Sequence, residues 1–392
     1  MKYNIWKDCP RAPITDLLSF VVDNRGKTVP TALEGWKLIA TNCVTNNTLF
    51  PVYEKVRYLS QETYETWFRA HPVPGDILFV NKGTPGRVCM VPDPVDFCIA
   101  QDMIALRADD KKIYNKYLFA VLRSWEIQQQ IYNTSVGDVI PHFKKQFMNQ
   151  LLIPVPERKI QEAIGDLYYQ ISYKIELNDK INKNLAEQAQ AIYENMILKN
   201  ADDSWPAGVL SDIANITMGQ SPKGDTYNED GNGTVFFQGR AEFGFRFPTR
   251  RLFTTDPKRM ATTNDVLMSV RAPVGDINVA YEECCIGRGL SAIKSKDFHQ
   301  SYILYTMLYL RKQLDIFNGE GTVFGSINRD ALNSLPIIIP PKSIMDHFEE
   351  IVSPMDNAIR NNHDEICRLV CIRDSLLPKL MSGDIDVSDI DL

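Results

Sequence analysis

The chain repeats itself, and this duplication constrains its fold more than any other feature of the sequence. The segment from Gly75 to Gly86 recurs 189 positions later, from Asn264 to Gly275. A second pair of matching segments begins at Gly137 and at Gly321, 184 positions apart. A repeat of about 190 residues is too long for a solenoid, whose units have roughly 20–45 residues. Each copy should therefore contain a globular domain of its own.

Each copy ends in a long stretch with helical periodicity. Apolar residues recur every three or four positions after Pro156 and again after Pro341. Such spacing, kept over almost 40 residues, predicts two amphipathic helices with coiled-coil character. Proline is tolerated just before a helix, but Pro354 lies inside the second stretch and predicts a kink or a break there.

The duplication also predicts how the two helices meet. Helices from duplicated units can pack antiparallel about a pseudo-twofold axis, which brings matched residues near both midpoints together. Asn178 and Asn362 are such a matched pair. We expect them to face each other near that axis, where a buried asparagine pair can fix the register of a coiled coil. The alternative is that both are exposed, since asparagine is mostly a surface residue.

The rest of each copy alternates short strand-like runs with glycine, asparagine and proline turns, which is typical of an α+β domain. A shorter helix is expected at residues 115–132 and at residues 300–317. The expected domain boundaries are 1–156 for the first globular domain, 157–200 for the first long helix, 201–341 for the second globular domain, and 342–392 for the second long helix with a tail.

Composition excludes several classes of protein. The chain has 392 residues, of which 44% are hydrophobic and 23% charged, as in globular proteins. No apolar run approaches the ~20 residues that span a bilayer, and the first residues lack the apolar core of a signal peptide. Eight cysteines without regular spacing are typical of a reduced, cytoplasmic protein rather than of a disulfide framework.

The sequence contains no convincing catalytic motif. No methyltransferase tetrapeptide or nucleophile elbow occurs. Asp93 followed by Asp109 and Asp110 loosely resembles a nuclease metal site, but the second copy has no counterpart. The cysteines and five histidines lack the spacing of a zinc site. We therefore expect no catalytic residue, no metal and no cofactor bound by this chain.

One stretch does suggest binding to a polyanion. Residues 236–259 hold six basic side chains and two acidic ones, interleaved with phenylalanine and glycine. Arginine suits bidentate contact with phosphate or guanine. The alternative is a solvated hairpin whose aromatic residues lie in the core.

These features together resemble the specificity subunit of type I restriction–modification enzymes. The resemblance rests on the duplicated Gly75–Gly86 and Asn264–Gly275 segments, the helices that follow prolines, and the ending from Arg373 to Ile385. It covers nearly the whole chain.

The resemblance implies a fold and a function. Each globular part would be a target-recognition domain that reads one half of a bipartite DNA site. The helices would pack as an antiparallel coiled coil, set the spacer, and dock two methyltransferase (modification) subunits. Those subunits would carry S-adenosylmethionine, and a restriction or translocase subunit would use ATP and Mg²⁺. The chain itself would be non-catalytic, cytoplasmic and prokaryotic, with double-stranded DNA as its ligand and no membrane contact.

Candidate DNA contacts follow from position in the repeat and from the basic stretch. The first domain offers Thr41, Asn42, Lys55, Arg57, Asn81 and Lys82. The second domain offers Gln238, Arg240, Arg246, Arg250, Arg251, Ser269 and Arg271. The two sets differ, which suggests that the domains read unrelated half-sites.

Two other functions remain open at this point. The chain could be a DNA-cleaving or DNA-modifying enzyme that acts alone, or a structural adaptor that uses only its helices. Activity of the purified chain with Mg²⁺ and S-adenosylmethionine would favour the enzyme. Absence of sequence-dependent DNA binding in the presence of a partner would favour the adaptor.

Overall fold

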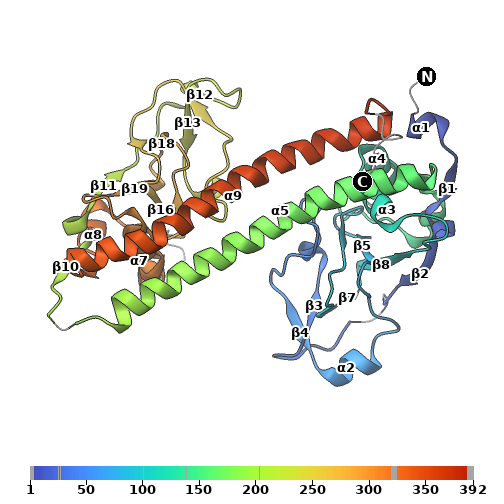
Figure 1. The fold of residues 1–392 in the computed structure, drawn as a ribbon, viewed down its shortest axis with the longest axis horizontal. Helices are drawn as coiled ribbons and strands as arrows, with labels where there is room; N and C mark the ends of the chain where they lie inside the picture. Colours follow the sequence, from blue (N-terminus) through green and yellow to red (C-terminus); the bar gives the residue numbers. More distant parts are fainter. Residues whose placement is uncertain are drawn as a thin grey trace. The chain divides into compact units, whose positions relative to one another are not determined.

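The computed structural model describes residues 4–24, 26, 28–99, 101–137, 139–202, 204–318 and 325–385. The chain forms two compact units. Unit 1 consists of Met1–Lys180 and Asn362–Leu392, and unit 2 consists of Ile181–Asn361. Each unit therefore contains one globular part and a portion of both long helices (Figure 1).

The helices in the described residues are α1 Ile5–Asp8, α2 Gln61–Thr66, α3 Asn115–Leu122, α4 Trp125–Thr134, α5 Arg158–Tyr193, α6 Leu210–Ile213, α7 Gln300–Leu314, α8 Arg329–Asn333 and α9 Lys342–Ser382. The strands of unit 1 are β1 Arg11–Pro13, β2 Leu18–Val22, β3 Trp36–Ile39, β4 Arg57–Leu59, β5 Ile77–Val80, β6 Val88–Met90, β7 Phe97–Ile99, β8 Met103–Ala108 and β9 Leu152–Pro154. The strands of unit 2 are β10 Ala207–Val209, β11 Ala214–Met218, β12 Tyr227–Asn228, β13 Thr234–Phe237, β14 Phe253–Thr254, β15 Met260–Ala261, β16 Val266–Ser269, β17 Ile277–Val279, β18 Cys284–Ile286, β19 Leu290–Ser295 and β20 Pro336–Ile338.

The sheets confirm the duplication. Unit 1 has an antiparallel sheet in the order β2-β8-β5-β6, and unit 2 has its counterpart in the order β11-β19-β16-β17. A second sheet in each unit contains one parallel pair, β3 with β7 and β13 with β18. A short ladder joins the start of each globular part to its end, β1 with β9 and β10 with β20.

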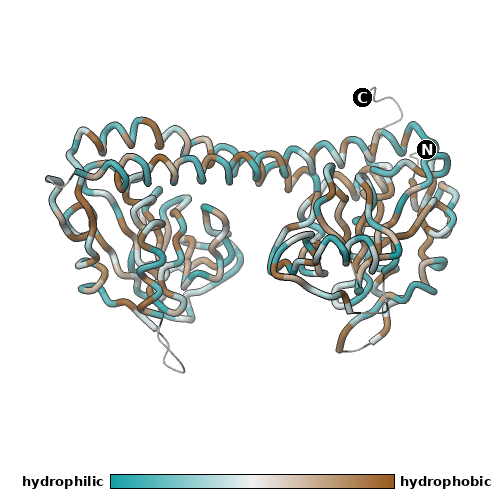
Figure 2. Tube along the Cα trace, turned by 90° about the horizontal axis from the view of Figure 1, so that it is seen from below, coloured by the Kyte–Doolittle hydropathy of each residue, from teal (hydrophilic) through white to brown (hydrophobic). Residues whose placement is uncertain are grey.

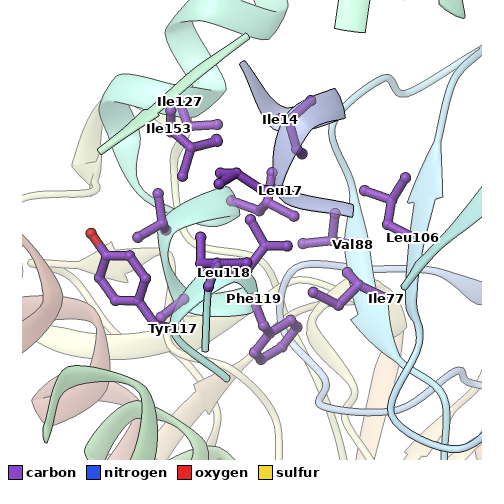
Figure 3. Close-up of a cluster of buried hydrophobic side chains, with 14 of the residues drawn as sticks. Ile14, Leu17, Ile77, Val88, Leu106, Tyr117, Leu118, Phe119, Ile127 and Ile153 are labelled. Atoms are coloured by element: carbon purple, nitrogen blue, oxygen red, sulfur yellow. The ribbon is translucent and has the colours of Figure 1, made fainter. Parts of the chain in front are cut away.

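The main core of unit 1 lies between the antiparallel sheet and helices α3 and α4. Figure 3 shows Leu118 and Phe119 of α3 facing Ile77 of β5 and Val88 of β6. All four side chains are fully buried. The same cluster includes Leu380 and its neighbours near the end of α9, so the C-terminal part of the chain completes the core of the N-terminal unit.

The long helices pair in the way that the sequence predicts. In unit 1, Lys174 on α5 forms an ion pair with Glu365 on α9 at 3.5 Å. In unit 2, the rings of Tyr193 on α5 and Phe348 on α9 meet with centroids 5.9 Å apart. Residues later in α5 therefore contact residues earlier in α9, which confirms the antiparallel arrangement. Apolar and polar positions alternate along both helices (Figure 2).

Two local predictions need correction. The helix expected at residues 115–132 is divided into α3 and α4, because Ser124 has an extended backbone and the Gln128 side chain donates to the Leu122 carbonyl oxygen at 2.6 Å. Of the kink or break expected at Pro354, the break is absent, because α9 continues through this residue, and the kink stays a prediction. Proline removes only one backbone hydrogen bond, and the buried Val352 and Ile359 hold the helix against the core of unit 2.

Several matched segments lie outside the described residues. They include Asp138 of the first copy, Gly321–Phe324 of the second copy, and residues 386–392 of the C-terminal tail.

Candidate nucleic-acid interface

Lys82 and Arg271 occupy the same place in the two units. Each is exposed, and each lies in the loop that follows a buried central strand, β5 or β16. Lys82 forms an isolated bridge with His142, and Arg271 forms one with Ser326. The structure therefore places one cation at the same sheet edge in each unit, as the repeat predicts.

Three loops converge around Arg271 in unit 2. Gln238 follows β13, Arg288 follows β18, and Arg271 follows β16. The amide of Gly289 donates to the Gln238 carbonyl at 3.2 Å, and the Val270 amide donates to Gly289 at 2.9 Å. Since β13 and β18 are parallel, their carboxyl ends meet at one edge. Gln238, Arg271 and Arg288 are all exposed there.

The loop that carries Arg288 requires its two glycines. A Cβ on Gly287 would lie 2.9 Å from the Gln238 Cα, and a Cβ on Gly289 would lie 2.7 Å from the Gln238 carbonyl oxygen. Sequence reasoning missed Arg288. Its Gly-Arg-Gly context, a basic residue between glycines that allow close backbone approach, was the available signal.

The corresponding edge of unit 1 is hollowed. The hollow is lined by two cationic side chains, Arg69 and Lys82, and by two acidic residues, Asp23 and Asp102, together with Gln101 and His142 among other residues. Asn81 joins this edge to the loop after β7, since its backbone amide donates to the Asp102 carbonyl at 2.8 Å. Sequence reasoning missed Arg69 and Gln101, because nothing in the repeat marks them.

A second set of polar side chains in unit 1 lies on the loop between β3 and β4 and at the start of β4. Asn42 is exposed and donates to the Glu54 carbonyl at 2.7 Å, next to the exposed Lys55. Arg57, on β4, is also exposed, and Thr41 is half-buried in the 3₁₀ turn after β3. The structure thus brings Asn42 and Lys55 together.

The arginines of the basic stretch have carboxylate partners, most of which come from elsewhere in unit 2. Arg240 pairs with Asp276, and Arg250 pairs with Glu282. Arg251 contacts Glu242 at 2.6 Å and Glu229 at 3.0 Å, and Glu242 holds the pKa of Arg251 above its usual range. All three arginines are exposed, but the local charge is lower than residues 236–259 suggest when counted alone.

Three candidates have too little surface for a DNA contact and are withdrawn. Arg246 is 8% exposed and contacts Asp356 at 3.2 Å. Asn81 is fully buried and donates to the Phe143 carbonyl at 3.2 Å. Ser269 is 1% exposed and donates to the Pro273 carbonyl at 2.7 Å. Neither position in the repeat nor membership of the basic stretch could reveal that these side chains are buried.

The described residues contain no group of three or more histidine, cysteine or acidic side chains that could hold a metal ion. Within the same residues, no helix has the length and apolarity needed to cross a membrane. None of the eight cysteines, all of which lie in the described residues, forms a disulfide. Six are buried, and Cys367 and Cys371 are exposed on α9.

Comparison with known proteins finds one matching family. The family model "Type I restriction modification DNA specificity domain" matches residues 29–187 and again residues 203–368. The "Putative type I restriction enzyme MjaX specificity subunit" of Methanocaldococcus jannaschii is 28% identical over 85% of this chain and 84% of its own length. The type I restriction enzyme MjaIX specificity subunit of the same organism is 21% identical over 81% of this chain and 79% of its own length.

A solved structure shares the fold. The crystal structure of the type I restriction–modification system S subunit from M. genitalium aligns over 97% of this chain and 98% of that chain, with a TM-score of 0.63 and 16% identity. At this identity the likeness concerns the fold alone.

Proposed function

Because the chain belongs to the type I restriction modification DNA specificity family, we propose that it is the sequence-recognition subunit of a type I restriction–modification complex. Both copies of the duplicated unit match the family model, and the two matches together cover most of the chain. The ligand of such a subunit is double-stranded DNA.

Each unit reads one half of a bipartite site. The observation that carries this proposal is the equivalent position of Lys82 and Arg271, exposed beside the carboxyl ends of a parallel strand pair in both units. Cations placed in this way can neutralise phosphates, while neighbouring polar side chains contact base edges. The neighbours differ, with Gln101 after β7 and Arg288 after β18, so the two half-sites should be unrelated.

The long helices set the spacer and dock two copies of a methyltransferase subunit. Apolar side chains that remain exposed on both helices of unit 1 support a docking role. These are Tyr173 and Leu177 on α5 and Ile372 on α9. In this assignment S-adenosylmethionine, ATP and Mg²⁺ bind to the methyltransferase subunits and to a restriction or translocase subunit, and the chain itself is non-catalytic.

Methylation mapping tests the recognition role. The chain is co-expressed with its modification subunit in a host that lacks other adenine methylation, and modified positions are read by long-read sequencing. We expect one bipartite motif, which disappears when this chain is omitted. Methylation that persists without the chain, or that has no sequence preference with it, would contradict the assignment.

Assays of the purified chain test the alternatives. With DNA, Mg²⁺ and S-adenosylmethionine but no partner, we expect neither cleavage nor methyl transfer. Either activity would instead identify a stand-alone enzyme. A complex that assembles with the modification subunit but binds all DNA sequences equally would identify an adaptor.

A further inference from the structure

A buried arginine fastens the same loop to helix α9 in both units. The loop follows the first strand of the parallel pair, β3 in unit 1 and β13 in unit 2, and begins with a 3₁₀ turn. It carries exposed DNA-contact candidates, Asn42 in unit 1 and Arg240 and Arg250 in unit 2. In each unit the fastening residue is itself almost inaccessible.

In unit 2 the fastening residue belongs to the loop. Arg246 lies in a tight turn in which the Gly244 amide donates to the Phe247 carbonyl at 3.2 Å. Its guanidinium forms an ion pair with Asp356 of α9 at 3.2 Å and donates to the Tyr305 hydroxyl oxygen at 3.2 Å. The Tyr305 hydroxyl donates in turn to the same carboxylate at 2.9 Å. Asp356 and Tyr305, the two partners of the Arg246 guanidinium, are thus hydrogen-bonded to each other.

A second arginine, on α9, strengthens this attachment. Arg360 lies one turn beyond Asp356 and donates to the Tyr281 carbonyl at 2.9 Å and to the Asn264 side chain at 2.7 Å. Its guanidinium also covers the ring of Phe247, the residue after Arg246, at 5.0 Å from the ring centroid. The loop is therefore held by Arg246, which reaches from the loop to α9, and by Arg360, which reaches from α9 to the loop.

In unit 1 the direction is reversed. Arg373 of α9 is 3% exposed and donates to the Asn47 carbonyl of the loop at 3.1 Å. Arg123, between α3 and α4, donates to the Thr45 carbonyl at 3.2 Å and also to the Thr48 carbonyl. A backbone carbonyl thus accepts in unit 1 where a carboxylate accepts in unit 2. The sequence repeat does not align these residues, so only the structure shows that the two arrangements are alike.

We propose that Arg246 and Arg373 are positioning residues for DNA recognition, each serving the half-site read by its own unit. This inference rests on the proposed function. Neither guanidinium is accessible to DNA. Each instead joins the loop that carries the exposed contacts to helix α9. A small misplacement of contacting groups is enough to weaken recognition strongly.

The test uses the full chain in complex with its modification subunit. Arg246→Ala and Arg373→Ala are compared with Arg158→Ala, a control that removes an exposed arginine of α5 paired with Glu162. Methylation mapping gives the tolerance at each half-site. DNA affinity is measured as a function of salt, because each lost phosphate contact lowers the slope of log affinity against log salt by about 0.9.

We expect Arg246→Ala to relax one half-site and Arg373→Ala to relax the other. In each case discrimination at the affected half should fall by about tenfold, as for the loss of one good base contact. The salt slope should stay at its wild-type value in both variants. If either variant relaxed both halves equally, or lowered the slope as a phosphate contact does, the positioning role would be refuted.

Two further measurements keep the test decisive. Asp356→Asn removes the charge of the carboxylate while retaining its shape. If Arg246→Ala does not fold, Asp356→Asn takes its place and should relax the same half-site. Hydrogen exchange of the free chain should show lost protection at residues 243–248 in the unit 2 variants. That measurement needs no DNA, so unchanged protection would overturn the fastening even if the proposed function held. A wild-type complex without a bipartite motif would instead overturn the proposed function.

Discussion

Asn178 on α5 donates a hydrogen bond to Glu365 on α9 over 2.8 Å, and Asn178 is only 1% exposed. Glu365 lies one helical turn beyond Asn362, the partner that the duplication suggests. Asn178 is therefore buried between the helices of unit 1, and a carboxylate accepts from its amide. That Asn178 and Asn362 face each other stays a prediction. The hydrogen bond from Asn178 also lowers the pKa of Glu365, because the amide stabilises the charged form.

Replacing Asn178 by alanine should destabilise unit 1 by about 1 kcal/mol, since a typical hydrogen bond contributes that much. Urea unfolding of the full chain measures the change. Lys174→Ala removes the other partner of Glu365, an exposed ion pair, and should have a smaller effect. An Asn178 variant as stable as the Lys174 variant would show that the buried bond contributes no more than an exposed ion pair.

Glu349 predicts a dependence of unit 2 stability on pH. Burial raises its pKa above the ordinary value of 4.5, although the amides of Ser301 and Tyr302 donate to it. A raised carboxyl pKa means that the folded state binds the proton more tightly, so stability falls as pH rises above 4.5 and through the folded pKa. Relative to Glu349→Gln, the wild-type free energy of unfolding should therefore increase as pH is lowered from 7 towards 4.5. The opposite trend in parallel urea titrations would contradict it.

Lys82 and Arg271 should each contribute to the salt dependence of DNA binding. Alanine at either position should lower the slope of log affinity against log salt by about 0.9, and the double variant by about twice as much. Arg158→Ala, which changes an exposed arginine on α5 paired with Glu162, is the control. Arg240, Arg250 and Arg251 already have carboxylate partners, so their replacement should change the slope less. Equal slopes for wild type and the double variant would show that neither residue contacts a DNA phosphate.

Replacing Gly165 in α5 by alanine tests how closely α5 approaches α3. In an isolated helix, alanine is more favourable than glycine by about 1 kcal/mol. Here a Cβ at Gly165 would lie 2.6 Å from the backbone nitrogen of Tyr117. Gly165→Ala should therefore destabilise the chain, measured by its thermal midpoint, whereas Gln170→Ala on the exposed face should change it little. A higher midpoint for Gly165→Ala would mean that the helices separate without cost.

The sequence predicts the layout well because the layout depends on long, regular patterns. The duplicated segments and the sustained periodicity after Pro156 and Pro341 specify two α+β domains and two long helices. The helix between residues 115 and 132 was less predictable. Its division at Ser124 depends on a side-chain hydrogen bond from Gln128 that composition and periodicity do not reveal.

The candidate site was only partly predictable. Lys82 and Arg271 follow from the repeat, because equivalent loops keep equivalent positions. Arg246 illustrates why charge alone misleads. An arginine in a basic stretch looks like a phosphate contact, but its carboxylate partner lies 110 residues away in the sequence and becomes visible only in three dimensions.

Leu380 near the end of α9 is 2% exposed in the core of unit 1. Leu380→Ala should cost about 2–5 kcal/mol, as for other buried leucines. Ile372→Ala, on the same helix but 48% exposed, should cost much less. Urea unfolding separates the two, and equal effects would mean that the end of α9 does not support this core.

The discontinuity of unit 1 has a consequence for synthesis on the ribosome. Unit 2 is one continuous segment, Ile181–Asn361, whereas the N-terminal domain needs side chains near Leu380 that are translated after unit 2. Part of the apolar core of the nascent N-terminal domain therefore stays open to water until the end of α9 emerges. The domain made first is thus completed only after the second. A ribosome that stops short of the final helical turns releases a chain whose second domain is whole and whose first is not.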